Sequence, residues 1–129
     1  MAENFLAPHS KEDLSNSLTL QEQAAVQTFL QRLHRHCGQT LQQAVLFGSK
    51  ARGDSAPDSD IDILIIVHEE SWPLRDAIST IAARVSLEYA VLIGPRVVGQ
   101  ERWQRLERER FSLYENVARE GIPLFLEVV

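Results

Sequence analysis

Two short motifs in the middle of the chain have the residue types needed for metal and phosphate chemistry. Asp60 and Asp62 stand two positions apart at the start of the most apolar segment of the sequence. Side chains at positions i and i+2 of a strand point to the same side, so these carboxylates are expected to be neighbours. Two such groups stay ionised cheaply only when a cation lies between them. Hard divalent cations with oxygen ligands, Mg²⁺ first, are the natural partners.

Ten residues before the aspartates, the pair Gly48-Ser49 follows a predicted strand. Glycine lets the backbone approach a ligand closely, and exposed amides together with a serine hydroxyl can hold phosphate oxygens. Arg52, and with it Lys50, can neutralise phosphate charge. We place Arg52 and Ser59 with the glycine–serine pair among the candidate nucleotide-binding residues. A phosphate-binding turn, a carboxylate pair and a cation together describe a nucleoside triphosphate with its metal.

The spacing of the two motifs is that of a known signature. The segment from residue 46 to residue 67, LFGSKARGDSAPDSDIDILIIV, contains the pattern G-S-x10-D-x-D with an apolar run on each side. It resembles the polymerase β nucleotidyltransferase superfamily, in particular its minimal members, the MNT domains. The ending REGIPLF, residues 119–125, is also similar to that group. The resemblance implies an α/β (α+β) single-domain polymerase β-like nucleotidyltransferase fold, with a mixed central sheet flanked by helices.

The resemblance also implies a role for each motif position. Asp60 and Asp62 would hold two Mg²⁺ ions that bridge the triphosphate of ATP and the attacking hydroxyl, and Gly48 and Ser49 would hold its β- and γ-phosphates. The family completes this site with a third acidic residue from a neighbouring strand. Glu88 is the only acidic residue in a suitable strand-like context, although aspartate is commoner in the family. The alternative for Glu88 is a surface glutamate at a strand edge.

The acceptor of the nucleotide is predicted from the same resemblance. MNT proteins are typically paired with HEPN-domain proteins in toxin–antitoxin modules, where the MNT antitoxin attaches AMP to a toxin tyrosine or binds the toxin. We predict protein adenylylation. Two alternatives stay open: a non-catalytic antitoxin that has kept the nucleotide pocket, and transfer to a small-molecule hydroxyl of the aminoglycoside kind. If the protein is an enzyme, the acceptor comes from a separate molecule or from a second subunit of a homo-oligomer.

Simpler explanations exist for parts of the motif. A calcium loop could begin at Asp58, with alternating aspartates and a glutamate at its twelfth position, but an EF-hand needs glycine at the sixth position, where this chain has Ile63. Arg52 can form a salt bridge with Asp54 or Asp58 as readily as it can contact phosphate. These two roles of Arg52 are compatible.

Composition sets the outer limits of function. The 129 residues suffice for one compact domain. The net charge of −5 argues against a duplex nucleic acid binder that works by neutralising many phosphates. The single cysteine, Cys37, is expected to be a buried free thiol. The N-terminal segment has no apolar signal region and no apolar run is long enough to span a bilayer, so we expect a cytoplasmic protein without a membrane segment.

The periodicity of apolar residues predicts the elements that position the motifs. Residues 1–17 are expected to form a flexible lead-in, and residues 18–129 the nucleotidyltransferase domain. A capping box of Thr19 and Glu22 opens the first predicted helix. Ser71 is expected to cap the second helix, and Glu88 falls either at the end of that helix or inside the strand that follows. The predicted helices cover residues 19–37, 71–85 and 100–120, and the predicted strands residues 43–47, 60–67, 87–93 and 122–128.

Overall fold

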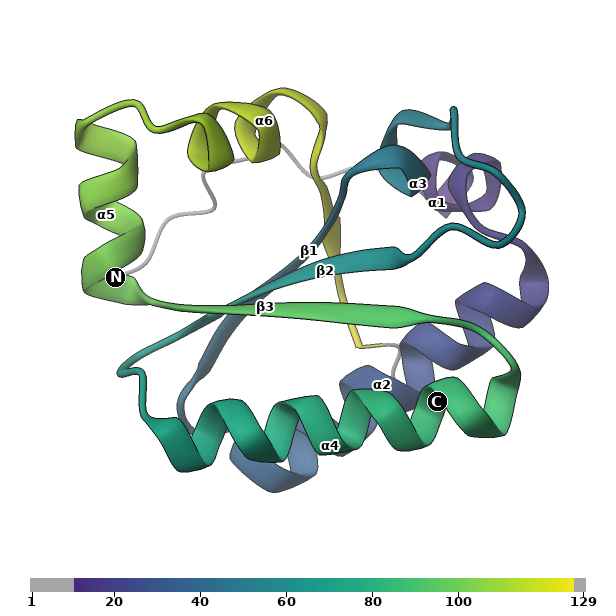
Figure 1. Ribbon diagram of the computed structural model, residues 1–129, viewed down its shortest axis with the longest axis horizontal. Coiled ribbons are helices and arrows are strands. Elements are labelled where there is room, and N and C mark those ends of the chain that lie inside the picture. The colour runs from purple at the N-terminus through teal and green to yellow at the C-terminus, as the bar shows by residue number, and fades with distance from the viewer. Residues whose placement is uncertain (1–10, 127–129) are drawn as a thin grey trace.

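A four-stranded mixed sheet with helices on both faces forms the centre of the protein (Figure 1). The computed structural model describes residues 11–126, and their side chains from residue 14 onward. In chain order the elements are α1 (Lys11–Ser17), α2 (Leu20–Cys37), β1 (Leu41–Phe47), α3 (Ser49–Arg52), β2 (Ile61–Val67), α4 (Trp72–Tyr89), β3 (Ile93–Gly99), α5 (Gln100–Arg108), α6 (Ser112–Glu120) and β4 (Ile122–Leu124).

The strands lie in the order β3-β2-β1-β4. Strand β1 pairs antiparallel with both β2 and β4, whereas β2 pairs parallel with β3. The predicted α/β (α+β) class, with a mixed central sheet flanked by helices, is confirmed. Strand β2 therefore lies inside the sheet, which explains why its sequence is apolar on both faces.

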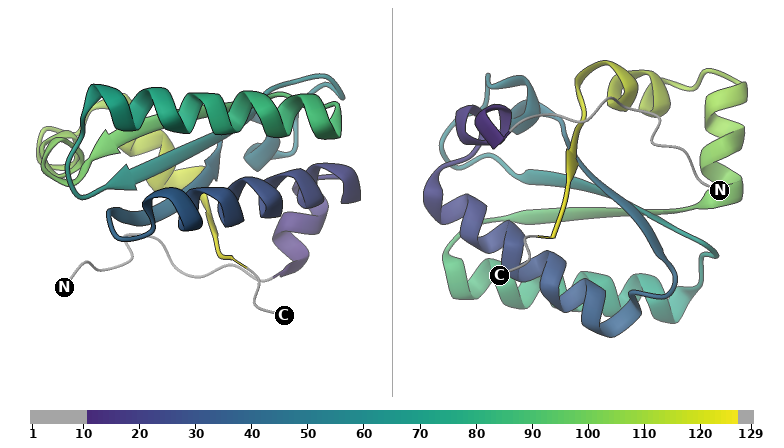
Figure 2. Two further views of the ribbon diagram at one scale, coloured as in Figure 1. Left: turned by 90° about the horizontal axis from the view of Figure 1, so that it is seen from below. Right: turned by 180° about the vertical axis from the view of Figure 1, so that it is seen from behind.

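Alternate residues of β2 face two separate apolar layers. Ile61, Ile63 and Ile65 belong to the larger core cluster, which also contains the buried residues of α2 and α4. Leu64 and Ile66 belong to a smaller cluster together with residues of α5 and α6. The views from below and from behind show α2 and α4 covering one face of the sheet (Figure 2). By the alternation of a strand, Asp60 and Asp62 share the side of the second cluster.

The start of α2 follows the sequence prediction. Thr19 Oγ1 accepts a hydrogen bond from Glu22 N at 3.1 Å, and Glu22 Oε1 accepts one from Thr19 N at 2.9 Å. The capping box is confirmed. Cys37 is buried and free, as its helical spacing predicts.

Three of the predicted element boundaries are wrong. The predicted flexible lead-in fails for residues 11–17, which form α1, because Leu14 and Leu18 have a core to pack against; residues 1–10 lie outside the described part. The predicted helix over 100–120 is two helices, separated where Arg110 takes a positive φ of 56°. The predicted last strand is shorter, ending at Leu124, and residues 127–129 lie outside the described part.

The strand predicted over residues 87–93 is also wrong. Helix α4 continues to Tyr89 and ends at Ala90, whose φ of 56° lies in the left-handed region. The next strand, β3, begins only at Ile93. The apolar run that suggested a strand includes Leu87, which is exposed, and Tyr89, whose hydroxyl lies 2.6 Å from Thr28 Oγ1 on α2. None of the helices formed by residues 11–126 has both the length and the apolar character needed to cross a membrane.

Candidate active site

The carboxylate pair sits where β2 begins. Asp60 is exposed just before the strand, and Asp62 is half-buried within it. Burial and the negative charge of Asp60 raise the pKa of Asp62 above its ordinary value, and the positive charges of Arg96 and Arg52 partly oppose this. The pair is therefore a place where a cation would relieve like-charge repulsion.

The glycine–serine turn lies directly against this pair. Gly48 has a φ of 78° and a ψ of −158°, a conformation that is open essentially only to glycine. A Cβ atom added there would lie 2.4 Å from Asp62 Oδ2. Phe47, the last residue of β1, is paired with Asp62 across the sheet. The two motifs, ten residues apart in sequence, thus form one site in which backbone and carboxylate are in contact.

Ser49 opens the one-turn helix α3, and its carbonyl oxygen accepts hydrogen bonds from Gly53 N at 3.0 Å and Asp54 N at 3.2 Å. These bonds close the turn on its C-terminal side. Ser59 closes the following loop, because its hydroxyl accepts a hydrogen bond from Ala56 N at 3.0 Å. Both candidate serines thus lie in ordered turns beside the carboxylate pair.

Lys50 does not face the site. Its side chain is buried, and Nζ lies 2.7 Å from Glu22 Oε2 on α2. The idea that Lys50 neutralises phosphate is therefore wrong: its charge is already matched by a buried carboxylate. Burial raises the pKa of Glu22, but the bonds from Lys50 and Thr19 outweigh that effect and hold it below its usual value. This ion pair fixes α3 to the N-terminal part of α2.

Arg52 is exposed on the same short helix and makes two ion pairs. Its Nε lies 3.1 Å from Asp54 Oδ2, and its Nη1 lies 3.0 Å from Glu120 Oε1 at the end of α6. The salt bridge to Asp54 is confirmed, and the one to Glu120 is additional. Arg52 also lies near enough to lower the pKa of Asp62. Its guanidinium is thus placed to release the exposed carboxylate of Asp54 and pair with a phosphate.

Glu88 is not brought to the site. It lies on α4, half of its side chain is exposed, and it forms a two-pronged ion pair with Arg32 on α2, at 2.8 and 2.9 Å. Helices α2 and α4 cover the face of the sheet opposite the carboxylate pair. Within the described part of the chain no three His, Cys, Asp or Glu side chains are grouped to hold a metal ion. The expectation that Glu88 completes a set of three carboxylates is wrong, because its strand is a helix.

Strand β3 supplies the remaining wall of the site, which the sequence reasoning missed. Gly94 is paired with Asp62, and Arg96 with Leu64. Gly94 and Arg96 therefore lie on the same side of the sheet as the carboxylates. The signal that could have revealed it is the alternation of apolar Ile93 and Val97 with Gly94 and Arg96.

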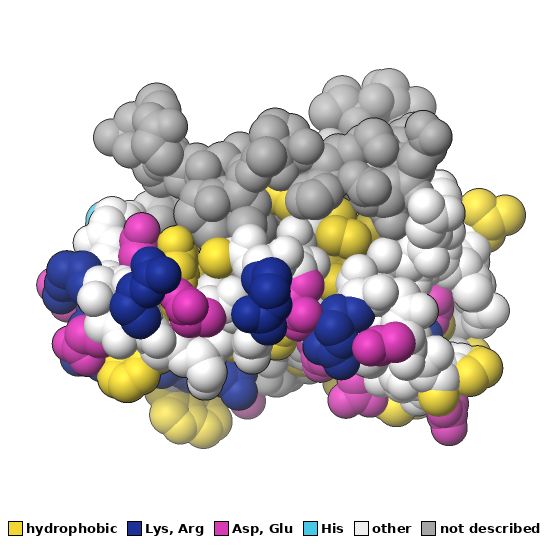
Figure 3. All heavy atoms as spheres, turned by 90° about the horizontal axis from the view of Figure 1, so that it is seen from above, with side chains coloured by type: hydrophobic (Ala, Val, Ile, Leu, Met, Phe, Trp, Pro, Cys, Tyr) yellow, Lys and Arg dark blue, Asp and Glu magenta, His cyan; other side chains and the backbone are white. Residues whose placement is uncertain are grey.

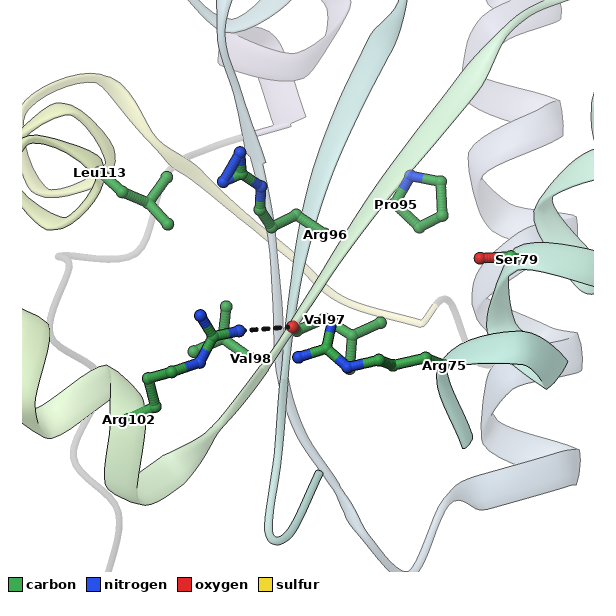
Figure 4. Close-up of a pocket in the computed structure, with 8 residues that line it drawn as sticks. All are labelled: Arg75, Ser79, Pro95, Arg96, Val97, Val98, Arg102 and Leu113. Atoms are coloured by element: carbon green, nitrogen blue, oxygen red, sulfur yellow. Dashed lines mark hydrogen bonds between the residues drawn. The ribbon is translucent and has the colours of Figure 1, made fainter. Parts of the chain in front are cut away.

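Beside this wall lies a cavity of about 310 Å³ with three arginines, Arg75, Arg96 and Arg102 (Figure 4). Arg75 and Arg102 approach β3 from α4 and α5, and both are paired with Glu70. Arg102 Nη2 also donates to the carbonyl oxygen of Val97 at 3.3 Å, which caps part of the open edge of β3. Arg96 contributes positive charge to the approach to the carboxylate pair.

Charge on the outer surface is mixed in sign. The view from above shows basic and acidic side chains interspersed over the visible face (Figure 3). Among the described residues, Arg52 pairs with Asp54, and Arg110 with Glu115.

The donor set fits a hard divalent cation in part. Asp60 and Asp62 offer carboxylate oxygens on one side of a rigid central strand, and Gly48 and Gly94 keep the adjacent backbone free of side chains. Oxygen ligands of this kind suit Mg²⁺ or Mn²⁺. Such an ion can polarise phosphoryl oxygens, while the glycine–serine turn offers space and amides for phosphate. An aspartate pair beside a glycine–serine turn, on a four-stranded mixed sheet, is the arrangement that the resemblance to nucleotidyltransferases implies.

Comparison with known proteins gives the family. Residues 26–114 match the nucleotidyltransferase domain family, so the chain belongs to that family, and the predicted enzyme class is confirmed. A protein of Methanocaldococcus jannaschii named "putative protein adenylyltransferase MJ0604" is 30% identical over 106 residues, which span 82% of this chain and 100% of that protein. A second, "putative protein adenylyltransferase MJ0141" of the same organism, is 46% identical over 56 residues, 43% of this chain and 57% of that protein.

Solved structures agree with the fold. One described as a "putative minimal nucleotidyltransferase" is 28% identical with a TM-score of 0.52, covering 79% of this chain and 91% of that one. Another, described as a toxin–antitoxin with AMP-PNP, has 21% identity and a TM-score of 0.53, with 77% of this chain and 72% of that one covered. The predicted resemblance to minimal nucleotidyltransferases is confirmed.

Proposed function

We propose that the protein transfers AMP from ATP to a hydroxyl of a partner protein, in a reaction that depends on Mg²⁺. The observation that carries this proposal is the contact between the two motifs, in which the Asp62 carboxylate lies against the backbone of Gly48. A triphosphate held by the glycine–serine turn would be adjacent to a cation held by Asp60 and Asp62. The names of the Methanocaldococcus relatives support a protein as the acceptor.

Each group has a defined task in this proposal. Asp60 and Asp62 would hold the cation, whose chemistry when bound would be to stabilise charge on the phosphoryl oxygens. Gly48 and Ser49 bind the outgoing phosphates, Ser59 supports the loop, and Arg52 neutralises charge once released from its surface carboxylates. The chain's contribution is positioning and electrostatic stabilisation of an in-line attack on the α-phosphorus, with pyrophosphate leaving.

The partner we propose is a toxin of the HEPN class, so that this chain acts as the antitoxin. The description of the AMP-PNP neighbour as a toxin–antitoxin supports a toxin as the partner. The acceptor must approach past β3, since β1 and α3 form the phosphate side of the site. The arginines of that wall are therefore expected to lie beside the acceptor segment.

Transfer from labelled ATP to the protein encoded by the neighbouring gene tests the proposal. With Mg²⁺ present, the partner should gain the mass of one AMP, and the label should be lost with chelator. The variant Asp60→Asn/Asp62→Asn should reduce transfer by about 100-fold or more. If this variant still neutralises the partner fully, binding alone is the function. Absence of transfer by the unaltered protein, with ATP bound normally, would refute adenylylation.

A further inference from the structure

Gly94 occupies the position from which a third ligand would reach the carboxylate pair. It is the register partner of Asp62 in the parallel pairing of β2 and β3. A Cβ atom added at Gly94 would lie 3.5 Å from Asp62 Oδ1 and 3.8 Å from Asp60 Oδ2. These are ordinary van der Waals distances, so a side chain there would fit and would point at both carboxylates. In this chain the position has no side chain at all.

No other described residue fills the gap. Glu88 is turned to Arg32 on the opposite face of the sheet, and among residues 14–126 no third acidic, histidine or cysteine side chain joins the pair. The nearest charged residue along β3 on this side is Arg96, whose charge favours the ionised form of Asp62 and repels a cation. The protein alone thus offers a cation two carboxylates and one open side.

We propose that Gly94 makes the cation site incomplete, so that the chain binds Mg²⁺ as a joint complex with a nucleoside triphosphate and holds the free ion only weakly. Mg²⁺ demands six oxygens in near-octahedral geometry and dehydrates reluctantly, and it is commonly held by one or two carboxylates plus substrate phosphates. The phosphates on the glycine–serine turn supply the missing oxygens on the open side. This inference rests on the proposed function, because it needs a triphosphate at that turn.

Coupling of the two ligands follows from this arrangement. If the triphosphate completes the coordination of the cation, then each ligand raises the affinity for the other by the same factor. We expect a factor of about 10 or more, within the ordinary range of coupling between sites. A cation site that the protein completes by itself would show little coupling.

Binding of Mn²⁺ measures this coupling directly, because the electron paramagnetic resonance signal of free Mn²⁺ disappears when the ion binds. The measurement does not depend on catalysis. The unaltered protein should bind Mn²⁺ weakly alone, and about tenfold or more tightly with a non-hydrolysable ATP analogue. Gly94→Asp should bind Mn²⁺ about tenfold more tightly without nucleotide, and Gly94→Ala, which adds the Cβ but no carboxylate, should not. Melting temperatures of the variants report whether they fold.

The outcomes separate this inference from the proposed function. Equal Mn²⁺ affinity of the unaltered protein with and without the ATP analogue overturns the inference, while AMP transfer in the same preparation would leave the function standing. The inference is also overturned if the Gly94→Asp variant folds but binds Mn²⁺ no more tightly than the Gly94→Ala variant does. If the unaltered protein binds no ATP with either Mg²⁺ or Mn²⁺ present, the proposed function is overturned instead. The measurement on the unaltered protein decides even if Gly94→Asp does not fold.

Discussion

The two sides of the carboxylate pair are built in different ways. On the phosphate side, one continuous segment from residue 46 to residue 67 supplies the turn, the loop and the aspartates, and its parts meet because β1 and β2 are adjacent antiparallel strands. On the other side, strand β3 follows the 18-residue helix α4 in the chain, and its parallel register with β2 decides which of its residues lie beside the aspartates. The phosphate side therefore contains both the glycine–serine turn and the aspartates, whereas the β3 side presents Gly94 where a further metal ligand could stand.

This difference separates what a motif can specify from what tertiary structure decides. A contiguous motif fixes both residue types and their distance, so it predicts a site. A residue contributed by a later strand depends on where the intervening helix ends. Here the end of α4 at Ala90 shifts the strand beyond Glu88 and brings Gly94 opposite Asp62.

The largest effect is expected on the phosphate side, for Lys50→Met. Removing Lys50 would leave Glu22 buried and uncompensated, and breaking a buried pair in this way costs about 3 kcal/mol or more in unfolding free energy. Denaturant unfolding measures it. The double variant with Glu22→Gln should recover part of the loss. Arg52→Met removes two ion pairs of an exposed guanidinium on the same short helix and should lose less. Equal losses for Lys50→Met and Arg52→Met would contradict the anchoring role.

The turn itself is tested by Gly48→Ala. The substitution forces a side chain into a backbone conformation reserved for glycine and against Asp62 Oδ2, so we expect a loss of about 2 kcal/mol and a clear fall in ATP affinity. Gly53→Ala is the control, because Gly53 has a φ of 81° but nothing within 4 Å of an added Cβ. It should cost about 1 kcal/mol and leave ATP affinity unchanged. Equal ATP binding by the two variants would show that the contact with Asp62 is irrelevant to the nucleotide.

The β3 side is tested by Glu70→Gln. Glu70 accepts a hydrogen bond from Gly99 N at 2.8 Å and pairs with Arg75 and Arg102, so it joins the end of β3 to α4 and α5. Burial opposes ionisation, but these bonds lower its pKa from 4.5 to about 2. Because the arginines are partly exposed, we discount the stabilisation to about 1–2 kcal/mol.

The sign of the pH effect follows from that lowered pKa. The stabilisation by Glu70 is complete above its unfolded pKa of about 4.5 and is lost as the pH falls towards about 2. The difference in unfolding free energy between the unaltered protein and Glu70→Gln should therefore be largest near neutral pH and shrink below pH 4.5. A difference that stays constant from pH 7 to about pH 3 would contradict the assignment.

Much of the phosphate side could be predicted from sequence, and little of the β3 side. The capping box of Thr19 and Glu22 and the central strand are encoded by local spacing, so they appear where expected. The burial of Lys50 could not be predicted because its partner, Glu22, lies far from it in the sequence, on helix α2. The strand predicted around Glu88 failed because apolar residues at a helix end imitate a strand, and the left-handed conformation of Ala90 carries no strong sequence signal. Register, which places Gly94, emerges only from packing.

The smallest effect is expected for Glu88→Gln. Glu88 and Arg32 form an exposed pair between α4 and α2, and such pairs contribute little because water and salt screen them. The melting temperature should scarcely change, and the affinities for Mn²⁺ and for ATP should stay as they are. Asp62→Asn is the matched comparison, since it removes a single carboxylate charge at the site and should weaken nucleotide-dependent Mn²⁺ binding. If Glu88→Gln weakens Mn²⁺ binding as strongly as Asp62→Asn does, then the end of α4 must rearrange when nucleotide binds, and the contrast between the two sides of the site would hold only for the free protein.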